Sequence, residues 1–369
     1  MIPVNTPLIS GNEKKYLMEC IETGWISSEG PFVEKFEEKF SSYIGRRFGV
    51  SVTNGTAALE AAVCALNLPK NSEVIVPTFT IISCAAAIIR NGLIPIPVDC
   101  DLKTFNASAE NISEAITEKT SAIMVVHIYG MPCDMDAILK IADKHKLKVI
   151  EDAAEVIGQE YKGKKCGTFG DISTFSFYPN KHITTGEGGM VLTDDKKISS
   201  HLKSLRNLCF KPEKRFVHDE LGWNFRMTNL QAALGLAQLE QIENFLIKKR
   251  FIGKAYNNNL RDLEGINLPL SHIDYAENIY WVYSIVLNKD LNLKAQSVMK
   301  SLNDEGIGTR PFFYPLHKQP VLSPYFKTRK KFKNSEFLSE YGFYLPSGLG
   351  LKENEIDIVC KKLKKIIES

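Results

Sequence analysis

One lysine, Lys181, stands among hydroxyl residues and glycines, between two stretches that resemble strands. Residues 172–178 are rich in β-branched and aromatic types, and Pro179 then removes a backbone donor and ends the strand. Gly186, Gly188 and Gly189 mark a turn before the apolar run 190–192. A lysine in this setting can bind a phosphate as a point charge, or its amine can form a Schiff base with a carbonyl group. The alternative is a solvated surface lysine in a turn.

A second stretch that could bind a ligand follows the short predicted strand 48–52. The small-residue turn 53–56 contains Gly55 and Thr56 and leads into a helical pattern that continues through Leu66. Backbone N–H groups in the first turn of a helix lack intrahelical partners, and the Thr56 hydroxyl adds another donor. The pattern predicts an anion site. The alternative is an ordinary N-cap with nothing bound.

The first part of the chain alternates strands with helices. We expect strands at 48–52, 74–76, 94–98, 122–128 and 149–150, with helices at 81–89, 108–116 and 135–145 between them. Such alternation indicates right-handed crossovers and a largely parallel, buried sheet, with ligands outside the carboxyl ends of its strands. Thr56, Asp152 and Lys181 each follow such an end. The sequence therefore predicts these three side chains at one edge of the sheet.

The remainder of the chain has a different pattern. We expect one long helix at 230–251, a strand at 280–287, an extended segment at 309–317, and helices at 295–305 and 353–367. A chain of 369 residues is long for a single core. We therefore expect a large α/β domain over residues 1–235 and a smaller α+β domain over residues 236–369.

Composition excludes several classes of protein. The net charge is +3, too small to indicate nucleic-acid binding, and we interpret the basic runs 327–331 and 361–365 as solvated helix faces. The eight cysteines form no CxxC pair, which argues against zinc and disulfides and fits a reducing cytoplasm. No signal peptide is evident, and the longest uncharged run, 74–89, is too short to span a membrane.

A lysine, an acid and an anion site at one sheet edge fit a particular cofactor. Pyridoxal phosphate (PLP) needs a lysine for its aldehyde, a cradle for its phosphate and a carboxylate beside its ring nitrogen. Lys181, Thr56 and Asp152 supply these groups. Neither GxGxxG nor GxxxxGKS occurs, so dinucleotide and P-loop sites lack their motifs.

Nearly the whole chain resembles the DegT-type sugar-nucleotide aminotransferases, which are PLP enzymes of the aspartate aminotransferase fold (fold type I). That fold has a mostly parallel seven-stranded sheet in its large domain and a smaller α+β domain. The resemblance rests on the stretches GWISSEGPFVEKFE, TNGTAAL, EVIVPTFT, VHIYGMPCDMD, VIEDAAE, GTFGDISTFSFYPNKHITTGEGGM, NFRMTNLQAALGLAQLE and RPFFYPLH.

The resemblance also implies roles for individual residues. Lys181 matches the Schiff-base lysine that also shuttles a proton, and Asp152 matches the partner of the ring nitrogen. The other implied cofactor contacts are Gly55, Thr56 and Ser176 at the phosphate, Glu155 near the ring hydroxyl, Ile81 where the family commonly has an aromatic residue on the ring, and Asn224 reaching the neighbouring subunit's phosphate. Trp25, Ser27, Arg310 and His317 match positions near the sugar nucleotide.

The implied activity is transamination of a nucleotide-linked 4-keto-6-deoxyhexose with L-glutamate, in a homodimer that shares its active sites. The reaction is of the GDP-perosamine or dTDP-viosamine type and serves O-antigen or other surface-glycan synthesis, with the cofactor passing through pyridoxamine phosphate. Amination at C3 is an alternative. A dehydratase subgroup has histidine in place of the lysine, and here His182 follows Lys181. A PLP-binding regulatory protein without turnover is a further alternative, but the retained Lys181, Asp152 and Arg310 argue against it. A basic module that binds nucleic acid lacks aromatic interleaving and any known motif.

Overall fold

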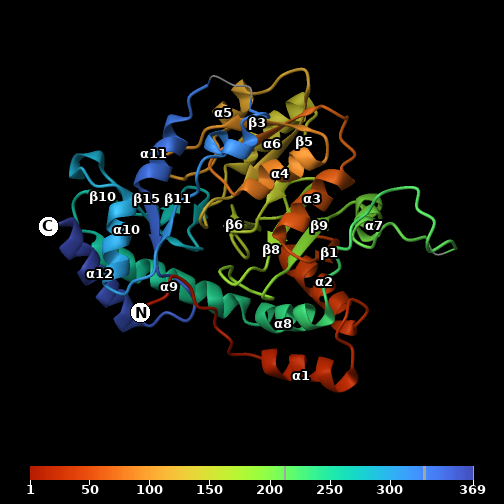
Figure 1. Ribbon diagram of the computed structural model, residues 1–369, viewed down its shortest axis with the longest axis horizontal. Helices are drawn as coiled ribbons and strands as arrows, with labels where there is room; N and C mark the ends of the chain where they lie inside the picture. Colours follow the sequence, from red (N-terminus) through yellow and green to blue (C-terminus); the bar gives the residue numbers. More distant parts are fainter. Residues whose placement is uncertain (212, 327–329, 369) are drawn as a thin grey trace.

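The computed structural model describes residues 1–211, 213–326 and 330–368, and its centre is a seven-stranded sheet (Figure 1). The strands, in spatial order, are β1 (Phe48–Val52), β9 (Gly189–Thr193), β8 (Ile172–Ser176), β5 (Lys148–Asp152), β4 (Thr120–Val126), β2 (Glu73–Pro77) and β3 (Ile94–Val98). Strands β8, β5, β4, β2 and β3 pair in parallel, whereas β9 runs antiparallel to both of its neighbours. The predicted mostly parallel α/β fold is confirmed.

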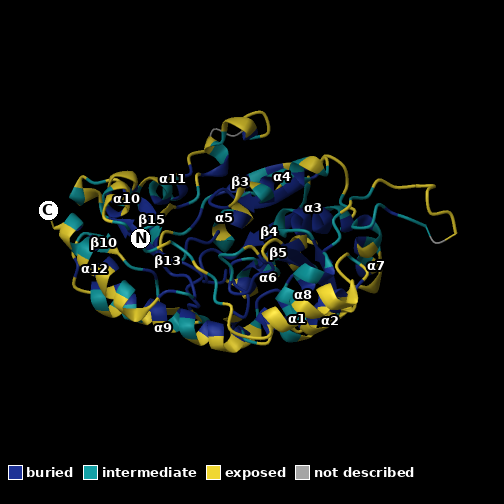
Figure 2. Cartoon of the chain, turned by 60° about the horizontal axis from the view of Figure 1, so that its bottom comes forward, coloured by how far each residue is buried: buried dark blue, intermediate teal, exposed yellow. Residues whose placement is uncertain are grey.

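Helices cover both faces of this sheet, so its strands are buried while the outer sides of the helices are exposed (Figure 2). One face carries α3 (Gly55–Ala65), α4 (Ile82–Arg90) and α7 (Lys196–Leu205). The other carries α2 (Pro31–Ile44), α5 (Ala109–Glu114), α6 (Met135–His145) and α8 (Asn229–Leu239), and α1 (Glu13–Thr23) packs outside α8. A short hairpin of β6 (Glu160–Tyr161) and β7 (Lys164–Lys165) lies after β5.

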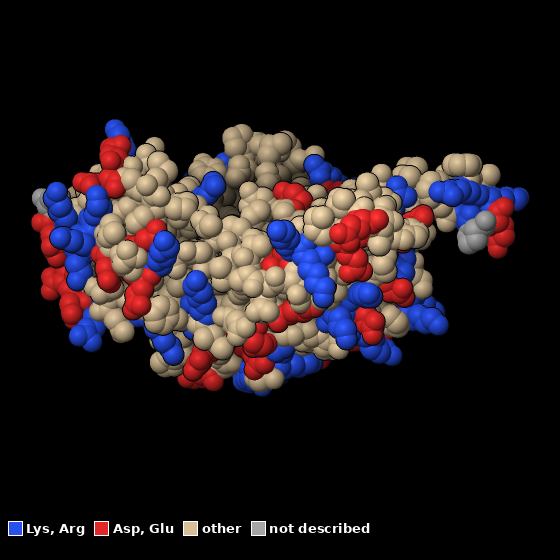
Figure 3. Space-filling model, turned by 90° about the horizontal axis from the view of Figure 1, so that it is seen from below, with Lys and Arg blue, Asp and Glu red and all other residues tan. Residues whose placement is uncertain are grey.

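Charged side chains of both signs are interspersed over the surface seen in Figure 3. The basic run 361–365 belongs to helix α12 (Glu353–Ile367), where Leu363 is buried and Lys361 and Lys365 are exposed, as predicted for a solvated helix face. Residues 327–329 of the other basic run lie outside the described residues. Among the described helices, none combines the length and the apolar character that crossing a bilayer requires.

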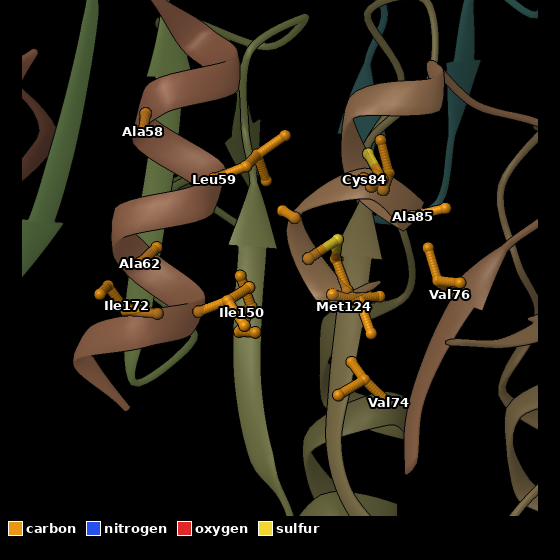
Figure 4. Close-up of a cluster of buried hydrophobic side chains, with 14 of the residues drawn as sticks. Ala58, Leu59, Ala62, Val74, Val76, Cys84, Ala85, Met124, Ile150 and Ile172 are labelled. Atoms are coloured by element: carbon orange, nitrogen blue, oxygen red, sulfur yellow. The ribbon is translucent and has the colours of Figure 1, made fainter. Parts of the chain in front are cut away.

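The core beneath α3 explains why this helix lies close to the sheet. Its inward face is made of small residues, so the helix backbone approaches the strands, and Ala58, Leu59 and Ala62 contact the side of the sheet that presents Ile150 and Ile172 (Figure 4). Each buried isoleucine contributes about 1.5–3 kcal/mol relative to an exposed one. This packing holds the first turn of α3 at the sheet edge.

The second part of the chain forms a four-stranded antiparallel sheet with its own core. Its strands, in spatial order, are β10 (Ile266–Asn267), β13 (Tyr283–Leu287), β15 (Gly342–Leu345) and β14 (Arg310–Pro311). Helices α9 (Ile242–Leu260), α10 (Ala295–Asp304) and α12 pack on this sheet, α11 (Lys333–Tyr341) precedes β15, and β11 (His272–Ile273) pairs with β12 (Ala276–Glu277). Three 3₁₀ turns are η1 (Lys289–Leu291), η2 (Leu316–Lys318) and η3 (Pro320–Leu322).

The N-terminal residues join the two parts. Ile2 forms a bridge with Ile307, and Val4 O accepts a hydrogen bond of 3.1 Å from Ser347 N, so the chain begins against the second sheet. Asn5 Nδ2 then donates to Pro179 O at 2.9 Å, beside the lysine loop. The division at residue 235 stays a prediction.

Several predicted elements differ from the structure in their bounds: the strand predicted at 122–128 lies at 120–126, and of the extended segment 309–317 residues 310–311 form β14 and 316–317 belong to η2. Two other differences have a clear cause. The long helix 230–251 is wrong: α8 ends at Leu239 and α9 begins at Ile242, because Gln241 N bonds to Gln238 O, three residues back, and interrupts the helix. The strand predicted from residue 280 begins at Tyr283, because Tyr280 has a φ of +49°, in the left-handed region that a strand does not adopt.

Candidate active site

A cavity of about 880 Å³ lies at the carboxyl ends of the parallel strands, between the two parts of the chain. Its lining brings together the side chains predicted from strand ends, Thr56, Asp152 and Lys181. It also contains the predicted residues Gly55, Ile81, Glu155, Ser176 and Arg310. The sheet-edge reasoning therefore locates the cavity correctly.

One wall of the cavity is a cradle at the start of α3. Asn54 caps the helix, and its side-chain oxygen accepts a hydrogen bond of 2.8 Å from Ala57 N. A Cβ added at Gly55 would lie 2.8 Å from Ser176 Cβ, so only glycine lets the start of α3 approach the end of β8 this closely. Thr56 Oγ1 lies 2.8 Å from Ser83 Oγ. Backbone N–H groups and three hydroxyls thus face one place, which suits a phosphate.

Asp152 is held rigidly at the end of β5. Its Oδ1 accepts from Ala154 N at 3.1 Å, its Oδ2 accepts from Cys84 Sγ at 3.4 Å, and only 4% of the residue is exposed. Burial raises the pKa of this carboxyl group, while the Ala154 N–H and the Lys181 amine act in the opposite direction. A cationic ring nitrogen placed beside the group would favour its ionised form.

Lys181 faces a second carboxyl group across the cavity. Its Nζ lies 3.9 Å from Glu155 Oε1, and Glu155 Oε2 accepts from Tyr129 N at 2.8 Å. Burial lowers the pKa of Lys181, opposed by the charges of Glu155 and Asp152. Burial raises the pKa of Glu155 to about 8, opposed by Lys181. The buried amine therefore loses its proton more readily than a surface lysine, as a nucleophile toward an aldehyde requires.

These residues fit PLP. The cradle suits the phosphate, Asp152 suits the ring nitrogen, and Lys181 suits the aldehyde. On β8, Thr174 belongs to the cavity lining, and its buried Oγ1 makes no hydrogen bond within the described residues, so a polar atom beside the cavity is left without a partner there. Ile81, 45% exposed, precedes α4 in the same lining, so an aliphatic side chain is available to the ring face there.

Four predicted residues lie outside the lining of this cavity in the single chain. His317 Nδ1 lies 2.8 Å from Thr78 Oγ1, and its Nε2 lies 3.2 Å from Glu336 Oε1, so its ring is already bonded. Trp25 and Ser27 are exposed in the loop after α1, and Asn224 is exposed in the loop before α8.

Sequence reasoning missed several lining residues, among them Asn5, Ser83 and Trp281. Trp281 reaches the cavity from just before β13, a hundred residues after Lys181, and no local motif marks it. Ser83 could have been predicted from the sequence, because it lies in the first turn of α4, two residues after the predicted site residue Ile81.

A cluster of His127, Glu151 and Cys166 lies buried outside the cavity lining, with potential ligand atoms within 4.8 Å of one another. His127 Nε2 lies 3.0 Å from Glu151 Oε1, and its Nδ1 accepts from Cys133 N. Glu151 also accepts N–H bonds from the loop 167–170. Glu151 is thus occupied in holding that loop, and both ring nitrogens of His127 are occupied by Glu151 and Cys133.

Fold, cavity and lysine together define a PLP-type enzyme, and comparison with known proteins identifies its family. Residues 7–364 match the DegT/DnrJ/EryC1/StrS aminotransferase family, and the chain belongs to that family. It is therefore an aminotransferase whose cofactor is PLP.

Several relatives match over nearly their whole length. The GDP-perosamine synthase of Escherichia coli O157:H7 is 42% identical, covering 99% of this chain and 98% of the relative. The GDP-perosamine synthase of Caulobacter vibrioides is 40% identical with the same coverage. Among solved structures, the aminotransferase from Psychrobacter cryohalolentis superposes with a TM-score of 0.92 at 26% identity, covering 98% of each chain.

Proposed function

We propose that this enzyme transfers the amino group of L-glutamate to C4 of a nucleotide-linked 4-keto-6-deoxyhexose, of the kind that yields GDP-perosamine. The carrying observation is the cavity in which Lys181 faces Asp152 and the cradle at Gly55. The proposal of a sugar-nucleotide substrate is supported by relatives named GDP-perosamine synthase, which are 39–42% identical over nearly the whole chain. The product would serve a surface glycan such as an O-antigen.

The chain's own residues divide the work. When bound, PLP supplies an electron sink for the carbon that gains or loses a proton. The Asp152 carboxylate holds the ring nitrogen protonated, and the cradle fixes the phosphate end. Lys181 Nζ carries the proton to and from that carbon, for which its lowered pKa suits it. Arg310, exposed on β14 at the cavity, supplies a cation for the nucleotide's phosphates.

A panel of substrates tests the proposal. The holoenzyme is incubated with L-glutamate and the 4-keto-6-deoxy sugars linked to GDP, dTDP and UDP, and with the matching 3-keto sugars. Mass spectrometry and NMR then read the product. We expect amination at C4 of the GDP sugar. Amination only at C3, or loss of the 3-hydroxyl without amination, would contradict the proposal, and so would binding of PLP with no turnover of any sugar.

We further propose a homodimer whose subunits complete each other's sites, with each chain divided at residue 235. Asn224, Trp25 and Ser27 are exposed and lie outside the single-chain cavity, although the family resemblance assigns them to it. Large apolar side chains nearby are also exposed, with Trp25 at 51% and Leu221 at 91%. Exposed apolar side chains in these two loops would become buried against a second copy of the chain.

Complementation tests the shared site. Lys181→Ala and Asn224→Ala are each expected to be inactive, and a mixed dimer has one site with both changes and one with neither. Activity should therefore return when the two variants exchange subunits. Exchange confirmed by tag pull-down without any return of activity would refute the sharing. Mixing Lys181→Ala with Asp152→Asn is the control, because both residues come from the same chain and no intact site can form.

We also propose a cytoplasmic enzyme. All eight cysteines are free thiols and seven of them are buried, which fits a reducing compartment. Separate measurement of the enzyme in cytoplasmic and periplasmic fractions tests this proposal, and recovery in the periplasm would contradict it.

A further inference from the structure

Trp281 places the face of its indole ring against the reactive amine. Lys181 Nζ lies 3.8 Å from the centroid of the ring, closer than the 3.9 Å that separate it from Glu155 Oε1. Trp281 is 4% exposed, and the Lys181 side chain is 10% exposed. The amine is thus enclosed between an aromatic face and a carboxyl group. An aromatic face attracts the ammonium form and offers no hydrogen bond that would hold it permanently.

The indole also fixes the loop that carries the lysine. Its Nε1 donates to Asn180 O at 2.7 Å, and Asn180 is the residue directly before Lys181. The ring packs on Tyr129 with a centroid distance of 5.8 Å, and Tyr129 N is the donor to Glu155. One side chain therefore contacts the reactive amine, the peptide before it and the residue that orients its carboxyl partner.

A buried lysine, Lys249, holds the backbone of Trp281. Lys249 Nζ donates to Trp281 O at 2.7 Å and to Ser347 O at 2.6 Å, and Ser347, like Trp281, lines the cavity. Lys249 is 3% exposed, and burial lowers its pKa to about 7. Burying an amine is costly unless it is hydrogen-bonded. The two bonds from Lys249 are therefore costly to break, and they fix the position of the Trp281 main chain.

We propose that Trp281 is a positioning residue for Lys181. Its indole face and N–H would hold the ε-amine in the orientation in which it can join the cofactor. The same indole face would bind the ε-amine when the substrate amine has replaced it at the cofactor. This inference deepens the proposed function and rests on it for the substrate, although its test needs only PLP. The C-terminal part of the chain thereby supplies one face of a lysine that belongs to the N-terminal part.

A double-mutant cycle on PLP affinity tests this inference. If Trp281 acts through the amine, Trp281→Leu raises the Kd for PLP by about tenfold in the wild-type background, because the amine is no longer oriented. In the Lys181→Ala background the same change alters the Kd by less than about twofold, because the cradle and Asp152 still bind the cofactor. Equal effects in both backgrounds, or no effect in either, would overturn the proposal.

Three further measurements complete the design. Trp281→Phe keeps an aromatic face but loses the bond to Asn180 O, so an intermediate effect is expected, and this variant replaces Trp281→Leu if the latter fails to fold. Tyr256→Phe is the matched control, since it removes one buried bond of 2.8 Å, to Pro346 O, and neither residue belongs to the cavity lining. The rate of borohydride-trapped linkage at Lys181 should fall with Trp281→Leu and not with Tyr256→Phe. None of these readouts uses a sugar, so they stand or fall independently of the substrate panel.

Discussion

Glu155 should make the stability of the apo-protein fall as the pH rises. Burial raises its pKa from 4.5 to about 8, so between these values the folded state binds more protons than the unfolded state. The stability that Glu155 contributes is complete below pH 4.5 and is lost as the pH rises toward about 8. Each pH unit in this window carries at most about 1.4 kcal/mol. Sharing of the proton with Lys181, 3.9 Å away, reduces this figure, and we expect about 2 kcal/mol between pH 5 and pH 8.

Glu155→Gln isolates this effect, because glutamine keeps the shape and the acceptor for Tyr129 N but does not titrate. Urea unfolding of the apo-protein at pH 5, 6, 7 and 8 gives the difference in unfolding free energy between variant and wild type. This difference should shift in favour of the variant by about 2 kcal/mol across the range. Glu305→Gln is the control, because the hydrogen bond from Lys362 lowers the pKa of Glu305 and its difference should stay constant. A constant difference for Glu155→Gln would refute the reasoning.

Three further changes test the cofactor site. Lys181→Ala should lose the borohydride-stable PLP adduct and at least about a hundredfold in turnover, read by mass spectrometry and a sugar assay. Asp152→Asn should still bind PLP through the cradle but lose at least about a hundredfold in kcat; near-normal kcat would remove its electronic role. Gly55→Ala places a Cβ 2.8 Å from Ser176 Cβ, so the cradle must shift; we expect the Kd for PLP to rise about tenfold and the melting temperature of the apo-protein to fall, as fluorescence titration and thermal unfolding would show.

The sequence predicted the parts of the site that follow from sheet geometry. Parallel strands end at one edge, so Thr56, Asp152 and Lys181 were expected together, and the cavity lining contains all three. The resemblance to the family added Glu155 and Ser176, which lie in the same lining. Their place in one lining follows because each residue stands within a few positions of a strand end whose place the hydrophobic pattern determines, and their roles stay predictions.

Contacts that depend on the second part of the chain were beyond this reasoning. Trp281 stands just before β13 in the second part of the chain, and its ring reaches Lys181 through an approach that no spacing in the sequence encodes. The family resemblance placed His317 near the sugar nucleotide; in the single chain its ring bonds to Thr78 and Glu336, and its role stays a prediction. Side-chain partners at long range decide such positions, and the periodicity of one element carries no information about them.

The positions of Lys181 and His182 bear on the choice between transamination and dehydration. Lys181 N bonds to Tyr178 O, and the resulting turn sends the Lys181 side chain into the cavity lining, which does not include His182. The His182 ring is 1% exposed, and burial holds its pKa well below the usual range. An imidazole shut away from the cavity cannot exchange a proton with a bound sugar, whereas the neighbouring amine faces the cradle and the carboxyl groups. The geometry of this loop therefore favours an aminotransferase whose proton carrier is Lys181.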